Sequence, residues 1–262
     1  MKKKIVVKLG SSSLTNEDCS LSRQLMVEIV RQVGYLYREG HQIVLVSSGA
    51  VAAGRELLSL AVDKTTLERK QMLASIGQVR LMQAWGELFR IYDIAIGQIL
   101  LTWDNIADKV SAINAQNTLL NLLAHGIVPI VNENDTVATE EFHFGDNDTL
   151  SAQVAHLIKA DWLILLTDQE GLLTSDPRLN PEAKLIETIE HIDETMLGFA
   201  QDSSHPNSLG KGGMASKVKA ARFATESGIN AVIASSRRPN VLLDVIEGKK
   251  IGTLFQSKLK SS

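Results

Sequence analysis

Ile5-Val6-Val7 opens the stretch of sequence that decides the fold, and Ile43-Val44-Leu45-Val46 closes it. Between these two β-branched runs, the segment from Ser22 to Glu39 repeats apolar residues at helical spacing and ends at Gly40. The apolar residues of this segment are Leu25, Met26, Ile29, Val30, Val33 and Leu36. A strand, a helix and a second strand in this order predict a parallel βαβ unit.

The same alternation continues along the chain. Further runs typical of buried parallel strands are Ile94-Ala95-Ile96, residues 127–131, residues 163–166 and residues 231–234. Helical patterns at residues 119–124 and 216–227 end near Gly126 and Gly228, each before one of these runs. We therefore predict a three-layer α/β/α sandwich with a mainly parallel central sheet. Residues 1–262 read as one domain, with a softer division near Ala160 between two ligand-binding lobes, about 1–160 and 161–262.

Composition narrows the class of protein. The 262 residues are 44% hydrophobic and 22% charged, which is ordinary for a soluble globular protein. With 27 basic and 30 acidic side chains the net charge is only −3, so no overall field attracts nucleic acid or an anionic membrane. The single cysteine, Cys19, cannot form an intramolecular disulfide, and the first apolar run stops at Lys8, too early for a signal peptide. We expect a cytoplasmic protein that binds neither nucleic acid nor membrane.

Two segments have the residue types of a phosphate site. Lys8-Leu9-Gly10-Ser11-Ser12 places a cation and a flexible turn after a strand, although it lacks the Walker A spacing. Residues 209–217 combine three glycines with Lys211 and Lys217 at the start of a helix, where unpaired N–H groups bind anions. The alternatives are a common strand–Gly–Ser turn and a flexible surface loop. The two segments predict either two phosphate sites or one that is assembled from both ends of the chain.

Polar residues follow other strands. Ser47-Ser48-Gly49-Ala50 leads into a helix whose N–H groups suit a carboxylate, although an N-cap serine explains the same pattern. Residues 131–135 (Val-Asn-Glu-Asn-Asp) and Gly145-Asp146-Asn147-Asp148, before a helix expected at Thr149, suit an ammonium group, Mg²⁺ or nearby lysines. Some of these residues are expected to be turns or caps, and their spacing excludes an EF-hand. Thr167-Asp168 suits either a nucleotide contact or a turn.

In their order along the chain, these motifs resemble the amino acid kinase family. The motifs are residues 7–12, 47–54, 131–135, 145–148, 166–168 and 212–217, and the match runs from about residue 4 to about residue 255. The resemblance implies an α/β/α sandwich that uses ATP with Mg²⁺. It also implies transfer of a phosphoryl group to the side-chain carboxylate of L-glutamate, which yields L-glutamyl 5-phosphate in the first step of proline biosynthesis.

The resemblance also implies roles for particular residues. The predicted acceptor-binding residues are Ser48, Gly49, Asn132, Asp135 and Asn147. The predicted ATP-binding residues are Lys8, Thr167, Asp168, Lys211, Gly212, Gly213, Met214, Ala215, Ser216 and Lys217. Lys8 and Lys217 flank the transferred group, and Asp148 holds both lysines in place. No nucleophilic side chain is needed, because the acceptor carboxylate is already ionised near neutral pH. No protein ligand of Mg²⁺ is assigned, since the ion arrives with ATP.

Two departures from the family pattern concern regulation and the nucleotide loop. Many members carry a C-terminal accessory domain of the RNA-modification (PUA) type, whereas this sequence ends at Ser262, so we expect a kinase module without that domain. Lys211 stands where threonine is common, and we predict no loss of ATP binding from this change. The resemblance further implies a homo-oligomer, dimer or tetramer, and raises proline as a candidate feedback inhibitor.

Three other functions compete with this interpretation. A sibling kinase acting on acetylglutamate, aspartate, carbamate or uridine monophosphate would share the nucleotide half. A catalytically silent amino-acid sensor would share the pocket, but the presence of Lys8, Asp148 and Lys217 together argues against it. A nucleotide-binding regulator of transcription or translation would need a basic face or a nucleic-acid module, and the sequence has neither.

Overall fold

The computed structural model describes residues 1–16, 18–59, 66–138, 147–175, 180–192, 196 and 213–257. Its strands are β1 (Lys4–Leu9), β2 (Gln42–Ser47), β3 (Ile96–Leu101), β4 (Val128–Glu133), β5 (Trp162–Thr167), β6 (Thr188–Ile189), β7 (Asn230–Ser235) and β8 (Thr253–Phe255). Its helices are α1 (Ser11–Leu14), α2 (Arg23–Arg38), α3 (Ala50–Leu58), α4 (Leu67–Arg90), α5 (Trp103–Ala107), α6 (Lys109–Ala124), α7 (Asn147–Leu157), α9 (Met214–Glu226) and α10 (Val241–Ile246).

Within these residues, the strands form one eight-stranded sheet in the order β3-β4-β2-β1-β5-β7-β8-β6. All neighbouring pairs are parallel except β7 and β8, which are antiparallel. Strands β1 to β4 occupy one half of the sheet and β5 to β8 the other, with β1 next to β5 in the middle. The carboxyl ends of the central strands therefore meet at one edge, which is where ligands bind in open α/β sheets.

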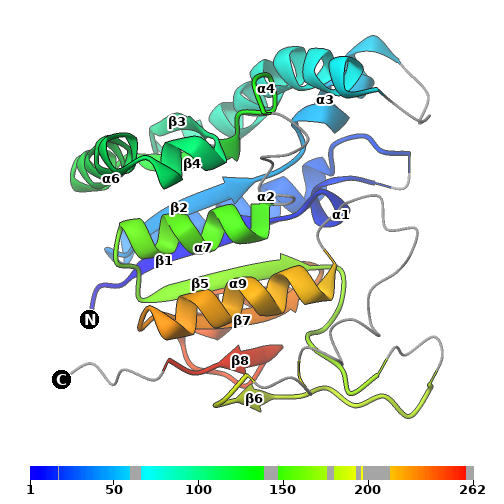
Figure 1. Cartoon of the computed structure of the whole chain (residues 1–262), viewed down its shortest axis with the longest axis vertical. Helices are drawn as coiled ribbons and strands as arrows, with labels where there is room; N and C mark the ends of the chain where they lie inside the picture. Colours follow the sequence, from blue (N-terminus) through cyan, green and yellow to red (C-terminus); the bar gives the residue numbers. More distant parts are fainter. Residues whose placement is uncertain are drawn as a thin grey trace.

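Helices cover both faces of the sheet (Figure 1). Because successive side chains of a strand point to opposite faces, Ile5, Val7 and Leu9 of β1 pack on one side and Val6 packs on the other. The first side is covered by α2, α3, α4 and α10, and the second by α6, α7 and α9. Figure 1 shows α7 and α9 lying side by side across the second face. The predicted α/β/α sandwich with a mainly parallel sheet is confirmed.

Most of the predicted elements are present, and the differences have identifiable causes. The strand predicted at residues 94–96 is instead β3, which begins at Ile96. Ile94 closes the turn after α4, with its N–H bonded to Phe89 O, while the half-exposed strand itself contains Gly97 and Gln98, which weaken the β pattern. The helix predicted at residues 119–124 begins at Lys109, and the one expected from Thr149 begins at Asn147.

Helices α3 and α4 cross at backbone contact, through two glycines. A Cβ atom on Gly54 would lie 2.1 Å from Leu73 O, and one on Gly77 would lie 1.8 Å from Ala50 O. Side chains at these positions would therefore force the two helices apart. This close crossing brings the middle of α4 next to the start of α3, at the carboxyl end of β2.

No helix in the described part of the chain is both long and apolar enough to cross a membrane.

Candidate active site

The centre of the site is a buried cluster of two lysines and one carboxylate. Lys8 Nζ lies 2.5 Å from Asp148 Oδ1, and Lys217 Nζ lies 3.2 Å from Asp148 Oδ2. The exposed fractions of Lys8, Asp148 and Lys217 are 3%, 0% and 5%. The two predicted phosphate segments, from opposite ends of the sequence, therefore supply their lysines to one cluster.

The strand alternation explains how Lys8 reaches this cluster. Val6 and Lys8 share one face of β1, which is the face that α7 and α9 cover. Asp148 lies in the first turn of α7 and Lys217 in the first turn of α9, so both helices present these side chains at their N-terminal ends. The carboxyl end of β1 thus meets the N-terminal ends of α7 and α9.

The cluster favours an anion. Burial by itself would raise the pKa of Asp148, but the positive charges of Lys8 and Lys217 outweigh burial and hold its pKa below the ordinary value. With all three groups ionised, the cluster carries one net positive charge in a site shielded from water. Such a site attracts negative charge strongly, because low polarity strengthens electrostatic interactions.

The backbone around the lysines adds hydrogen-bond donors. Gly10 passes so close to Lys8 that a Cβ atom there would lie 3.0 Å from Lys8 Nζ, so glycine avoids crowding the ammonium group. Helix α9 begins after Gly213, which has no side chain to cap it, and its first turn contains no acidic residue. Its first N–H groups therefore remain to bind an anion next to Lys217.

A chain of side-chain hydrogen bonds adjoins the cluster. Asn147, the neighbour of Asp148, donates both N–H groups of Nδ2, to Ser48 Oγ at 2.8 Å and to Asn132 Oδ1 at 2.9 Å. Asn132 Oδ1 also accepts from the backbone N–H of Glu133 at 2.9 Å, and Asn132 Nδ2 donates to Gln78 Oε1 at 2.9 Å. Asn132, Asn147 and Gln78 are each more than nine-tenths buried. Asn147 thus joins two other predicted acceptor-binding residues, Ser48 and Asn132, by hydrogen bonds.

The other predicted acceptor-binding residues lie at adjacent strand ends. Gly49 has a φ of 108°, a conformation that favours glycine, and precedes α3, which has neither a side-chain cap nor an acidic residue in its first turn. Ser47, the last residue of β2, accepts a hydrogen bond of 3.1 Å at Oγ from Trp85 Nε1, which connects α4 to the end of β2. Asp135 is half-buried just beyond β4.

The predicted nucleotide residues are described only in part. Thr167 ends β5 in a buried position, and its hydroxyl donates to the exposed Asp168 at 3.0 Å. Gly213, Met214, Ala215 and Ser216 lead into Lys217 on α9. Lys211, Gly212, Gly145 and Asp146 lie outside the described residues.

Sequence reasoning missed Gln78, which the structure joins to Asn132. The available signal was the pair Gly77-Gln78 within an otherwise amphipathic helical stretch, since a glycine in a helix interior indicates a close approach of backbone. Only the crossing of α3 and α4 shows that this approach occurs beside the site.

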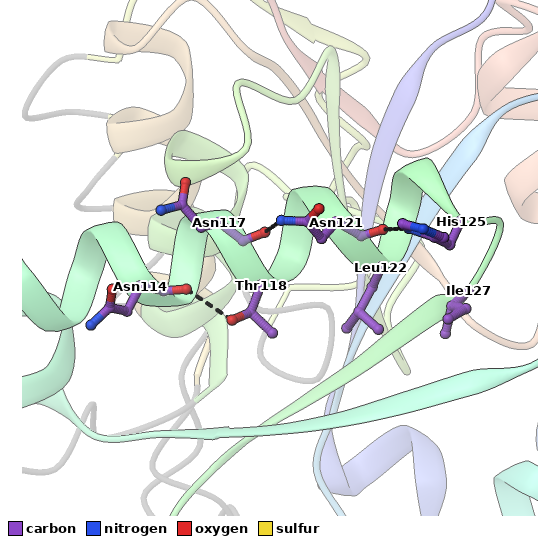
Figure 2. Close-up of a pocket in the computed structure, with 7 residues that line it drawn as sticks. All are labelled: Asn114, Asn117, Thr118, Asn121, Leu122, His125 and Ile127. Carbon is purple, nitrogen blue, oxygen red and sulfur yellow. Dashed lines mark hydrogen bonds between the residues drawn. The ribbon is translucent and has the colours of Figure 1, made fainter.

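The described parts of the chain hold no cluster of metal ligands, and a groove along α6 has a lining separate from this site. No group of three His, Cys, Asp or Glu side chains there could hold a metal ion. A groove along α6 (Figure 2) is lined by Asn114, Asn117, Thr118, Asn121, Leu122, His125 and Ile127, none of which belongs to the lysine cluster. Thr118 and Asn121 donate to the backbone of their own helix, as the dashed lines in Figure 2 show. This groove therefore has the features of an ordinary helix surface.

The class of protein follows from a match along most of the chain. The family model described as the amino acid kinase family matches residues 3–235, so the chain belongs to the amino acid kinase family. Within that family it is similar to proteins named glutamate 5-kinase. It is 50% identical over 254 residues to the one from Enterobacter sp. (strain 638), a match that covers 97% of this chain and 69% of that protein. It is 51% identical to the one from Haemophilus influenzae (strain ATCC 51907 / DSM 11121 / KW20 / Rd), with 97% and 68% covered.

Solved structures share the fold at low sequence identity. The carbamate kinase from Giardia lamblia bound to AMP-PNP superposes with a TM-score of 0.68 at 15% identity, over 98% of this chain and 99% of that one. The UMP kinase from Ureaplasma parvum superposes with a TM-score of 0.65 at 17% identity, over 98% of this chain and 100% of that one. These similarities establish the fold, but they do not identify the acceptor of the phosphoryl group.

Proposed function

We propose that this chain transfers the γ-phosphoryl group of ATP to the side-chain carboxylate of L-glutamate, which yields L-glutamyl 5-phosphate for proline biosynthesis. The observation that carries the proposal is the contact of Lys8 and Lys217 with one buried carboxylate, Asp148, directly beside the hydrogen-bonded pair Asn147 and Asn132. A site for a transferred phosphoryl group and a site for a small polar acceptor thus adjoin at residues 147 and 148. The identity of about half the residues with proteins named glutamate 5-kinase supports glutamate as the acceptor.

The nucleotide side of the reaction uses the lobe of residues 161–262. The phosphates lie against the first turn of α9, with Gly213 to Ser216 offering backbone N–H groups and Lys217 a positive charge. Thr167 and Asp168 contact the nucleotide at the end of β5. Lys211 and Gly212 belong to the same proposed phosphate loop.

The acceptor side uses the lobe of residues 1–160. Ser48 and the backbone at Gly49 bind the carboxylates of glutamate, Asn132 and Asn147 line the acceptor site, and Asp135 pairs with the ammonium group of glutamate. The side-chain carboxylate is ionised at neutral pH and attacks the γ-phosphorus directly, so the P–O bond to ADP breaks as the new P–O bond forms.

Catalysis rests on charge and position. Lys8 and Lys217 face the phosphoryl oxygens from two sides and neutralise the charge that spreads over them in the transition state. Asp148 keeps both ammonium groups at fixed positions, so the site needs little reorganisation during transfer. Mg²⁺ would arrive with ATP and would supply further charge neutralisation. We place the reaction in the cytoplasm and propose a dimer or tetramer with proline as a feedback inhibitor.

An ATP-consumption assay with hydroxylamine trapping tests the function. The purified chain is incubated with ATP, Mg²⁺ and, in separate reactions, glutamate, acetylglutamate, aspartate, carbamate or uridine monophosphate. We expect a hydroxamate with glutamate, because an acyl phosphate reacts with hydroxylamine. Hydroxamate with acetylglutamate or aspartate alone, or ADP formation with uridine monophosphate alone, would move the substrate assignment to a sibling kinase. Binding of glutamate without ADP formation from any acceptor would favour the sensor.

A further inference from the structure

The hydrogen bonds from Gln78 to Ser48 form a relay with a defined direction. The backbone N–H of Glu133 can only donate, so the Asn132 atom that faces it is the oxygen Oδ1. Asn132 therefore turns its NH₂ group toward Gln78, and Asn147 must use its own NH₂ group to reach Asn132 Oδ1. The same NH₂ group of Asn147 donates to Ser48 Oγ.

This direction decides what Ser48 does. Since Ser48 Oγ accepts the hydrogen bond from Asn147, its own hydroxyl proton points elsewhere and is free to donate. Ser48 is half-buried at the carboxyl end of β2, immediately before the uncapped start of α3. A hydroxyl donor beside helix N–H groups suits a carboxylate.

Gln78 has no packing reason to be a glutamine. Its side chain is only 8% exposed, and its Nε2 is buried without a hydrogen-bond partner among the described residues. A leucine or methionine of similar size would fill the same space without burying an unpaired donor, which is unfavourable. The one hydrogen bond that offsets this cost is the one that Gln78 Oε1 accepts from Asn132.

We propose that Gln78 is a positioning residue for the acceptor, which anchors the NH₂ group of Asn132 and so holds the relay in place for Ser48 to donate to a carboxylate of the bound amino acid. Gln78 acts through Asn132 and Asn147 and does not touch the acceptor itself. The inference rests on the proposed glutamate kinase activity and adds a residue from α4 to the determinants of acceptor affinity.

The test is a double-mutant cycle between residues 78 and 48, which are separated by Asn132 and Asn147. Gln78→Met keeps the volume and removes the acceptor oxygen. We expect it to raise KM for glutamate about tenfold, with KM for ATP unchanged, because one hydrogen bond in the relay is lost. In a Ser48→Ala background, the same substitution is expected to change KM for glutamate by less than about twofold, because the end of the relay is already absent.

Gln83→Met is the matched control, because Gln83 is exposed on the same helix. We expect it to leave both KM values unchanged.

Equal effects of Gln78→Met on KM for glutamate in the two backgrounds would overturn the inference, as would a rise in KM for ATP of the same size. An unchanged KM for glutamate in Gln78→Met would overturn it as well. Thermal unfolding of each variant separates loss of fold from loss of affinity, and if Gln78→Met does not fold, Gln78→Leu takes its place in the cycle. Failure of this inference can be told apart from failure of the proposed function. If the proposed function is wrong, the unsubstituted chain forms no hydroxamate from glutamate.

Discussion

Lys8 Nζ lies 2.5 Å from Asp148 Oδ1, and neither side chain is more than 4% exposed. The pair joins the end of the first strand to the first turn of α7, and Lys217 completes it from α9 at 3.2 Å. Two lysines this deeply buried depend on the carboxylate between them, because an uncompensated buried charge is strongly unfavourable. The cluster that we propose for catalysis therefore also contributes to stability.

Replacing Asp148 tests this dual role. Asp148→Asn keeps the shape and removes the charge, and we expect it to lower the free energy of unfolding by about 3–5 kcal/mol. We also expect a fall in kcat, because the lysines lose their fixed positions. Urea unfolding and steady-state kinetics measure the two effects. Glu226→Gln is the control, since its ion pair with Arg222 is about half exposed on both sides and surface pairs of this kind contribute little. Equal stability of Asp148→Asn and the unsubstituted chain would contradict the proposed role of the carboxylate.

The pH dependence of stability follows from the lowered pKa of Asp148. A carboxyl group with a lowered folded-state pKa contributes stability above its unfolded pKa, near the ordinary value of 3.8, and loses that contribution as the pH falls toward the folded value. We therefore expect the difference in unfolding free energy between the unsubstituted chain and Asp148→Asn to be constant from pH 7 to about pH 5 and to shrink below about pH 4. Urea midpoints of the two proteins across this range provide the measurement. A difference that grows in acid would show that the sign of the pKa shift is wrong.

The two lysines are expected to affect turnover more than folding. Lys8→Ala and Lys217→Ala should each lower kcat by about 100-fold or more, because each removes a charge that stabilises the transition state. Lys219→Ala is the matched control on α9, since Lys219 is exposed and lies only two residues after Lys217. Circular dichroism confirms the fold of each variant. Near-normal turnover in Lys8→Ala or Lys217→Ala would remove that lysine from the proposed catalytic residues.

Because α3 and α4 cross at backbone contact, replacing glycine by alanine is expected to have opposite effects on stability at two positions of α4. Gly77→Ala would bring a Cβ atom to 1.8 Å from Ala50 O, and we expect a loss of about 1–3 kcal/mol or more in stability. Gly86→Ala would place its Cβ 3.8 Å from the nearest atom, Ile96 Cδ1, so the better helix propensity of alanine should make it neutral or stabilising by up to about 1 kcal/mol. Thermal and urea unfolding of the two variants check the prediction. A Gly77→Ala protein as stable as Gly86→Ala would mean that α3 and α4 lie farther apart.

Because Gly77 precedes Gln78, Gly77→Ala is also expected to raise KM for glutamate, by shifting the helix that carries the start of the relay.

Local patterns were sufficient for much of the fold. Residues 5–7, 43–46, 127–131, 163–166 and 231–234 all fall within or largely within strands, because a strand buried on both faces reads as a continuous apolar run. The edge strand β3 was misplaced, since an edge strand is half exposed and tolerates Gly97 and Gln98. Helix α4 and the short strands β6 and β8 were not among the predictions.

The sequence by itself determined the class of protein, because the six motifs occur in one order along the chain; the match to the amino acid kinase family confirms that prediction. The roles of the individual site residues stay predictions. Tertiary structure decided that Lys8 and Lys217 share Asp148, and so that the two candidate phosphate segments contribute to one cluster. It also decided that Gln78 belongs beside Asn132. Such contacts join residues far apart in the chain, and they depend on the order of strands in the sheet and on how closely two helices cross, neither of which a local pattern encodes.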